Sequence, residues 1–403
     1  MMNEKDDVKA IRAAVKAVLP KIVAIRHQIH SHPEMGLKEF ETAKLAAAAL
    51  REFGCDEVTE GVGGTGVVAL IRGNRPDNGC TILLRADMDA LPLVEKTGCE
   101  WASETTGVMH ACGHDGHTAW ALATAYALAK TRDFAGTAMI VIQPGEEGWA
   151  GAKKMIDDGL FTRWNVAEVY AGHCAPEMPV GDYGFTQGAM MAVADLFHID
   201  VVGVGGHGAR PHHCIDPIVA AAQVVLALQT VVSRSIDPLH PAVVTVGGIK
   251  GGSEDGVSVI PESVRISGTV RCLDKADQDR IEARLQAICD GMSVTTGAQV
   301  KLTYKRLYPV LVNAEPQRQA AAAVFKELAG GTVHMDFPAS MGAEDFAFMT
   351  GVKPGAFVKV GTADASHTAK VHNPGFDFND AVIEDAATGF AVLLARRLNE
   401  GAR

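Results

Sequence analysis

Short apolar runs bounded by glycine or proline most constrain how this 403-residue chain can fold. Four of them have the length and composition of buried strands: residues 66–71, 81–84, 138–142 and 168–171. Helical spacing of apolar residues covers about 5–30, 39–53, 115–130 and 150–159. The later strands and helices alternate, which predicts an α/β fold with a mixed, largely parallel sheet.

Between residues 190 and 309 the predicted order changes to strand, helix, strand, strand, helix, strand. This βαββαβ order is typical of a ferredoxin-like unit. The α/β pattern then resumes, with a helix near 315–329, a strand at 356–360 and a closing helix at about 380–398. A chain of this length also favours two cores over one. We therefore expect one domain formed by 1–189 and 310–403, with a second domain, 190–309, inserted into it.

The charge balance favours a small-molecule partner. The formal net charge is −11, the pI is near 5.7, and no run of Lys or Arg occurs, which argues against nucleic acid and against a membrane partner. The first residues contain no apolar signal core, and no later stretch approaches about 20 uninterrupted apolar residues, so we expect a cytoplasmic protein. The eight cysteines lack the spacing of a disulfide framework and are expected to be thiols.

Cysteine, histidine and glutamate residues recur where predicted strands end. Cys112 and His114 lie two residues apart and can bind one metal ion. Glu146 and Glu147 follow the strand at 138–142, and His173 follows the strand at 168–171. Because ligands gather outside the carboxyl ends of strands in an α/β sheet, these side chains are expected to meet. His372 lies in a further motif near the end of the chain.

These residue types suit zinc, and they also accept manganese, cobalt or nickel. Taken alone, each motif has an ordinary structural explanation, since a cysteine is more often a small core residue and adjacent glutamates are usually solvated. The Glu146–Glu147 pair is less ordinary because Pro144, Gly145 and Gly148 frame it directly after a buried strand. The motifs together therefore predict a metalloenzyme.

Taken together, these motifs resemble those of the M20 metallopeptidase family. Within it, the chain is most similar to the amidohydrolase branch of hippurate hydrolases, N-acyl-amino-acid aminoacylases and auxin-conjugate hydrolases. The likeness spans nearly the whole sequence. It rests on eight motifs in order: 27–34 (HQIHSHPE), 84–92 (LRADMDALP), 112–117 (CGHDGH), 143–147 (QPGEE), 205–212 (GGHGARPH), 260–262 (IPE), 268–271 (GTVR) and 342–346 (GAEDF).

The resemblance implies two divalent metal ions per chain, bridged by Cys112. It implies that His114 and Glu147 complete one site and that His173 and His372 complete the other. Other branches usually bridge with an aspartate and have a histidine where Asp87 stands. The three aspartates of these motifs, Asp87, Asp89 and Asp115, are therefore expected to support the ligands rather than bind metal.

The resemblance also implies the roles of groups outside the ligand set. Glu146 would be the base that takes a proton from water and returns it to the leaving amine. The inserted domain would be a lid and dimerisation module, whose His207 reaches the active site of a partner subunit and stabilises the oxyanion. A homodimer or tetramer is expected.

Substrates in this branch are N-acyl or N-aroyl amino acids, whose free carboxylate needs a cation. Arg271 is the expected anchor, although an arginine on an exposed strand face is the competing explanation. Loops around Gly342 are expected to shape the acyl pocket. Ser258 departs from the family pattern, because an Asn usually precedes the triplet Val259-Ile260-Pro261.

Four other hypotheses compete with this one. A glycine motif at 203–208 fits G-x-G-x-x-G, but Pro211 and Pro217 argue against a nucleotide-binding helix there. A thiol hydrolase using Cys112 would leave Glu147 and His372 without a purpose. A binding protein without turnover would give Glu146 no purpose. A metallo-dipeptidase, or a deaminase on the same scaffold, stays open as the alternative function.

Overall fold

The structure, a computed structural model, describes residues 4–328 and 330–401. The chain forms two compact units. The first contains Met1–Gly188, Val312–Pro338 and Phe348–Arg403, and the second contains Ala189–Leu311 and Ala339–Ala347. The inserted segment expected at 190–309 falls within the second unit, which also takes in a short later segment.

The helices and strands of the first unit have these bounds: α1 Glu4–Ser31, α2 Phe40–Phe53, β1 Glu57–Val62, β2 Gly66–Arg72, β3 Thr81–Asp87, α3 His114–Thr131, β4 Thr137–Gln143, α4 Glu146–Trp149, α5 Gly151–Asp157, α6 Leu160–Arg163, β5 Val166–Pro179, β6 Tyr183–Gly184, α9 Glu315–Leu328, β15 Val333–His334, β16 Gly355–Ala363 and α11 Ile383–Glu400.

An eight-stranded mixed sheet organises the first unit, with strand order β1-β2-β4-β3-β5-β16-β6-β15. Its centre, β4-β3-β5-β16, is parallel. The pairs β1–β2, β2–β4 and β16–β6 are antiparallel, and the edge strand β15 is parallel to β6. The α/β prediction is therefore confirmed. The expectation of a largely parallel sheet holds only for the centre.

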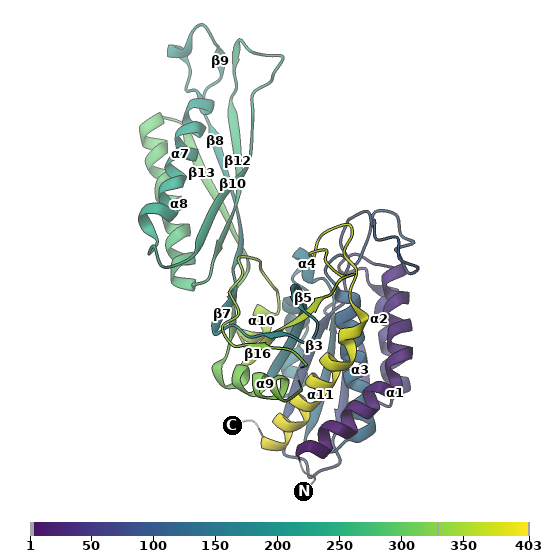
Figure 1. Cartoon of the computed structure of the whole chain (residues 1–403). Helices are drawn as coiled ribbons and strands as arrows, with labels where there is room; N and C mark the ends of the chain where they lie inside the picture. Colours follow the sequence, from purple (N-terminus) through teal and green to yellow (C-terminus); the bar gives the residue numbers. More distant parts are fainter. Residues whose placement is uncertain (1–3, 329, 402–403) are drawn as a thin grey trace. The chain divides into compact units, whose positions relative to one another are not determined.

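Both faces of the inner strands of this sheet are buried. Alternate residues of β2, β3 and β4 share a core with α1, α2, α3, α9 and α11, and Figure 1 shows α1, α3 and α11 side by side. Residues of opposite phase, such as Val68 and Leu83, are also buried, as expected for strands covered on both sides. The turn before β2 needs glycine, because Gly63 and Gly64 have φ values of 69° and 118°.

The second unit contains β8 Ala194–Val202, β9 Gly206–His207, α7 Pro217–Ser235, β10 Ala242–Gly251, β11 Val259–Ile260, β12 Ser263–Cys272, α8 Lys275–Thr296 and β13 Gln299–Tyr308. Three short elements lie where the two units join in sequence: β7 Gly188–Met191, β14 Leu311–Asn313 and α10 Ala347–Thr350.

The main sheet of the second unit has the order β10-β12-β8-β13 and is antiparallel. Helices α7 and α8 share a core with it. No long helix opens at the 203–208 glycines, because α7 begins only at Pro217, capped by Asp216. Among the described helices, α7 alone is long and apolar enough to cross a membrane by length and composition, a test that core helices also pass.

Candidate metal centre

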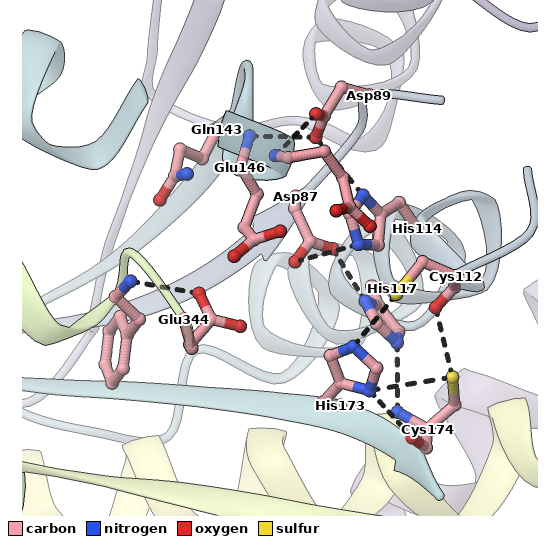
Figure 2. A network of polar contacts seen from close by, with 12 residues as sticks. Asp87, Asp89, Cys112, His114, His117, Gln143, Glu146, His173, Cys174 and Glu344 are labelled. Carbon is pink, nitrogen blue, oxygen red and sulfur yellow. Dashed lines mark hydrogen bonds and ion pairs between the residues drawn. The ribbon is translucent and has the colours of Figure 1, made fainter. Parts of the chain in front are cut away.

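One edge of the parallel centre of the sheet places most candidate ligands together. Strands β3 and β4 end at this edge, at Asp87 and Gln143, whereas β5 continues past it to Pro179. Glu146 and Glu147 lie in α4, three and four residues after β4 ends, and His173 lies within β5. His114 begins α3, and Cys112 lies in the turn two residues before it (Figure 2).

The five expected ligands form two overlapping groups. In one, donor atoms of Cys112, His114 and His173 all lie within 4.8 Å of one another, and in the other those of Cys112, Glu147 and His372 do. Both groups contain Cys112, as a bridging ligand requires. The expected division paired His114 with Glu147 and His173 with His372; the geometry groups them differently, because His173 approaches the Cys112 thiol from β5.

Individual distances agree with these groups. His173 Nε2 lies 3.4 Å from Cys112 Sγ, and His372 Nε2 lies 2.9 Å from Glu147 Oε1. The backbone of His372 is in the left-handed region, with φ of 62°, and its N–H donates to the carbonyl of Ala111. A non-glycine residue takes this conformation only where its surroundings hold it, so the bond beside Cys112 fixes the loop that carries His372.

The donor set fits divalent metal ions. His114 Nε2 is buried, makes no hydrogen bond to a described residue and lies 3.7 Å from Asp87 Oδ2, so this ring nitrogen can bind a cation. Burial, and after it the charge of Glu147, raises the pKa of the Cys112 thiol well above its usual range. A cation would supply the charge that stabilises a thiolate there. The same pKa shift argues against the thiol-hydrolase hypothesis, which requires an activated thiolate.

Asp89 holds the two glutamates and one histidine in place. Its Oδ1 accepts a hydrogen bond from the backbone N–H of Glu146 (3.0 Å), and its Oδ2 accepts one from that of Glu147 (2.9 Å). Its Oδ1 also lies 3.2 Å from Nδ1 of His114. Because Nδ1 faces the carboxylate, Nε2 of His114 is the nitrogen presented to the metal groups.

Burial opposes protonation of His114, but Asp87 and Asp89 outweigh it and raise its pKa to about 10. Asp87 is fully buried, and Arg85 donates to its Oδ2 at 2.7 Å. Burial raises the pKa of Asp87, but His114 and Arg85 reverse this and hold it well below the usual range. Asp87 therefore carries a negative charge beside the ligands.

Asp115 does not contact a candidate ligand in the way expected. Its Oδ2 lies 2.8 Å from His30 Nδ1 and accepts from Arg26 at 3.2 Å. Within the described residues, the hydrogen bonds of this carboxylate thus lead away from the metal groups. The reason is local: Asp115 directly follows His114 at the start of α3, so its side chain leaves the helix in a different direction.

The proposed base, Glu146, is buried, and its neighbour Glu147 is half-buried. Gly145 and Gly148 flank the pair with positive φ values, which gives α4 a kink rather than a regular turn. The kink presents both backbone N–H groups to Asp89, and the carboxylate of Glu147 belongs to the donor group of Cys112 and His372.

The remaining candidates lie in the second unit. His207 and Ser258 are exposed neighbours, because β9 pairs with β11 so that His207 opposes Val259. Arg271 is half-buried near the far end of β12 and donates to Thr269 Oγ1 at 2.9 Å. Burial lowers its pKa from the usual value. The N–H of Gly342 donates to Ser340 Oγ at 3.0 Å.

Sequence reasoning assigned no role to three polar residues beside the site: Arg85, Gln143 and Cys174. Arg85 and Asp87 are two residues apart on β3, a spacing that puts both on one face, so strand periodicity could have linked them. Cys174 directly follows His173, and its N–H donates to His117 Nε2. Both ring nitrogens of His117 are engaged by protein groups, Nδ1 by Asp87 and Nε2 by the N–H of Cys174.

Comparison with known proteins points to one family. Residues 83–396 match the sequence model of peptidase family M20/M25/M40. The hippurate hydrolase of Campylobacter jejuni is 39% identical, over 93% of this chain and 96% of its own. An N-acetylcysteine deacetylase of Bacillus subtilis is 36% identical, over 94% of this chain and 97% of its own.

Solved structures show the same likeness. A protein of Bacillus subtilis, described as a dinuclear metal-binding peptidase of the M20 family, has a TM-score of 0.82 and 34% identity. The match covers 95% of this chain and 99% of that one.

Proposed function

Because this chain belongs to peptidase family M20/M25/M40, in its amidohydrolase branch, and is a metal-dependent amidohydrolase, we propose that it cleaves N-acyl or N-aroyl amino acids. The products are a carboxylic acid and a free amino acid. One observation carries this proposal: two groups of candidate ligands share Cys112, and the carboxylate-bearing Glu146 adjoins one of those ligands.

We assign the two cations to the groups that the distances favour. Cys112, His114 and His173 would hold one, and Cys112, Glu147 and His372 the other. Zinc is the first choice, with manganese, cobalt or nickel as alternatives. When bound, such ions polarise the amide carbonyl and lower the pKa of water.

The protein groups then complete the reaction. Glu146 takes the proton of the attacking water and later gives it to the leaving nitrogen, so the carboxylate ends the cycle as it began. Asp89 supports this role because it holds the backbone of Glu146 at a fixed position.

The second unit would act as the lid and dimerisation module, with His207 serving the partner subunit. The separation of His207 and Arg271 within that unit supports this proposal. Ser263 and Arg271 are eight positions apart on extended β12, about 26 Å at 3.3 Å per residue, and His207 lies beyond the Ser263 end. A small N-acyl amino acid cannot touch His207 and Arg271 of one chain, so the two residues would serve different substrates.

Arg271 would then bind the substrate carboxylate of its own chain with Gly342 nearby, whereas Ser258, beside His207, would serve the substrate of the partner subunit. The half-buried position of Arg271 favours an anchor over a purely solvated arginine, since burial strengthens its attraction for an anion. An Arg271→Ala variant tests the assignment: a KM unchanged for every carboxylate substrate would move the anchor elsewhere.

The function itself is tested by amine release. N-Acetyl, N-benzoyl and N-indoleacetyl amino acids, together with dipeptides, are incubated with chelator-stripped and metal-reconstituted protein. Metal-dependent release from an acylated amino acid supports the proposal, and preference for dipeptides would favour the metallo-dipeptidase instead.

A Glu146→Gln variant separates chemistry from binding. It should retain both metals and lose at least about 100-fold in rate, because only the base is removed. An exposed glutamate on α2, changed as Glu41→Gln, is the matched control. A parent-like rate in Glu146→Gln would remove Glu146 from the mechanism.

A further inference from the structure

A buried chain of hydrogen bonds runs from the end of β4 toward His173, and Figure 2 shows its part from Asp87 through His117 and Cys174 to His173. Arg85 Nε donates to Gln143 Oε1 at 2.8 Å, and Arg85 Nη1 donates to Asp87 Oδ2 at 2.7 Å. The other oxygen of Asp87 lies 2.6 Å from His117 Nδ1. All four side chains are fully buried, so the chain is not interrupted by exposure of any member.

The chain ends on the backbone of β5. The ladder between β3 and β5 stops at the pair Arg85 and Ala171, so β3 offers no partner to the residues of β5 that follow. The N–H of Cys174 lies beyond that point and donates to His117 Nε2 at 3.0 Å. Without this imidazole, a buried backbone donor would lose its partner.

Each ring has one proton position that satisfies its partners. Cys174 N–H is a donor, so His117 Nε2 must accept, and the His117 proton lies on Nδ1 and is donated to Asp87. Nδ1 of His173 lies 2.7 Å from the carbonyl of Cys174 and must donate to it. The unprotonated Nε2 of His173 is then the atom that faces Cys112, 3.4 Å away.

We infer that His117 is a positioning residue that holds Cys174, and through its carbonyl fixes the ring and tautomer of the ligand His173. The inference rests on the proposed function, since it takes His173 as a metal ligand. The inference also assigns a role to the Arg85–Asp87 ion pair: Asp87, whose charge Arg85 balances, orients the ring of His117.

Metal binding tests this without any substrate. Zn²⁺ is titrated into chelator-stripped protein by calorimetry, and bound metal is counted after dialysis. His117→Phe keeps an aromatic ring against Trp120 but removes both hydrogen bonds. It should weaken binding of one of the two ions by about 10- to 100-fold and leave the other unchanged.

His117→Gln is the conservative variant, because an amide can both donate to Asp87 and accept from Cys174; it should restore most of the lost affinity. His110→Phe is the matched control. His110 is equally buried and makes no hydrogen bond to a described residue, so this variant should bind both ions like the parent.

Parent-like binding of both ions by His117→Phe would overturn the inference, as would equal weakening of both ions. If His117→Phe does not fold, His117→Asn, which can keep only one of the two bonds, takes its place with the same criteria. Failure of the proposed function looks different: the parent itself would then bind two ions and release no amine, or would not bind two ions.

Discussion

His30 shows how a buried histidine can be held as a cation. Its Nδ1 lies 2.8 Å from Asp115 Oδ2 and its Nε2 lies 3.3 Å from Glu95 Oε1, so both ring nitrogens face carboxylates. Burial opposes the charge, but the carboxylates outweigh it and raise the pKa to about 9. In turn, although burial of Glu95 acts in the other direction, hydrogen bonds from His30 and Thr97 lower its pKa to about 2.

This pair predicts a pH dependence of stability. His30 has a pKa near 6.5 when unfolded and about 9 when folded, so its contribution is complete below pH 6.5 and is lost as pH rises through 9. The contribution is on the order of 3 kcal/mol. In denaturant unfolding, the parent's advantage over His30→Gln should therefore shrink between pH 6.5 and 10. His32→Gln, an exposed neighbour, should show no such trend, and a constant advantage of the parent would contradict the assignment.

The candidate ligands were predictable at the residue scale because strand ends and motif spacing place them at one edge of the sheet. The hydrogen-bonded residues that hold these ligands in place were not predictable. Whether His117 binds metal or a backbone N–H depends on where the β3–β5 ladder stops, and the sequence around Ala171 carries no sign of that point. Asp115 was misjudged for a similar reason, since its partners Arg26 and His30 come from α1.

Helix α3 joins the site to the core, and its first turn packs tightly against neighbouring side chains. Gly116 lies in its first turn, where an added Cβ would come within 2.3 Å of the Phe378 ring. Gly116→Ala should therefore lower the free energy of unfolding of the first unit by about 1–3 kcal/mol.

Tryptophan fluorescence measures this effect, because all four tryptophans, Trp101, Trp120, Trp149 and Trp164, belong to the first unit. Gly291→Ala in α8 is the control: its Cβ would meet nothing within 4 Å, and it lies in the other unit. It should leave the fluorescence transition in place. An unchanged transition in Gly116→Ala would mean that the Phe378 ring can move aside.

The long helices of the first unit were predicted to within a few residues because their apolar periodicity is strong. Strand β5, predicted at 168–171, continues to Pro179. Strand β1 was missed, since it is largely exposed and its burial does not alternate. The two-residue strands β6, β9, β11 and β15 are too short to have a period. The antiparallel position of β2 against β4 was missed because apolar composition does not encode strand direction.

The assignment of His207 to a partner subunit can be tested on the whole molecule by mixing two inactive variants. Glu146→Gln lacks the base, and His207→Ala lacks the oxyanion donor. In a mixed dimer, the chain with intact Glu146 receives an intact His207 from its partner, so one site of two should work.

After denaturation and refolding together, an equal mixture should recover about one quarter of the parent rate, since half of the dimers are mixed. The two variants refolded separately and then combined are the control. No recovery after joint refolding would place His207 in the site of its own chain.

The first unit is built from stretches at both ends of the chain, and β5 is completed only when β16 pairs with it. During synthesis, the ribosome releases β5 well before Gly355–Ala363 exists, so one edge of a hydrophobic central strand stays unpaired in the interval. His372 arrives later still. We therefore expect the nascent chain to be vulnerable to aggregation, and its candidate metal groups to be incomplete, until its translation is almost finished.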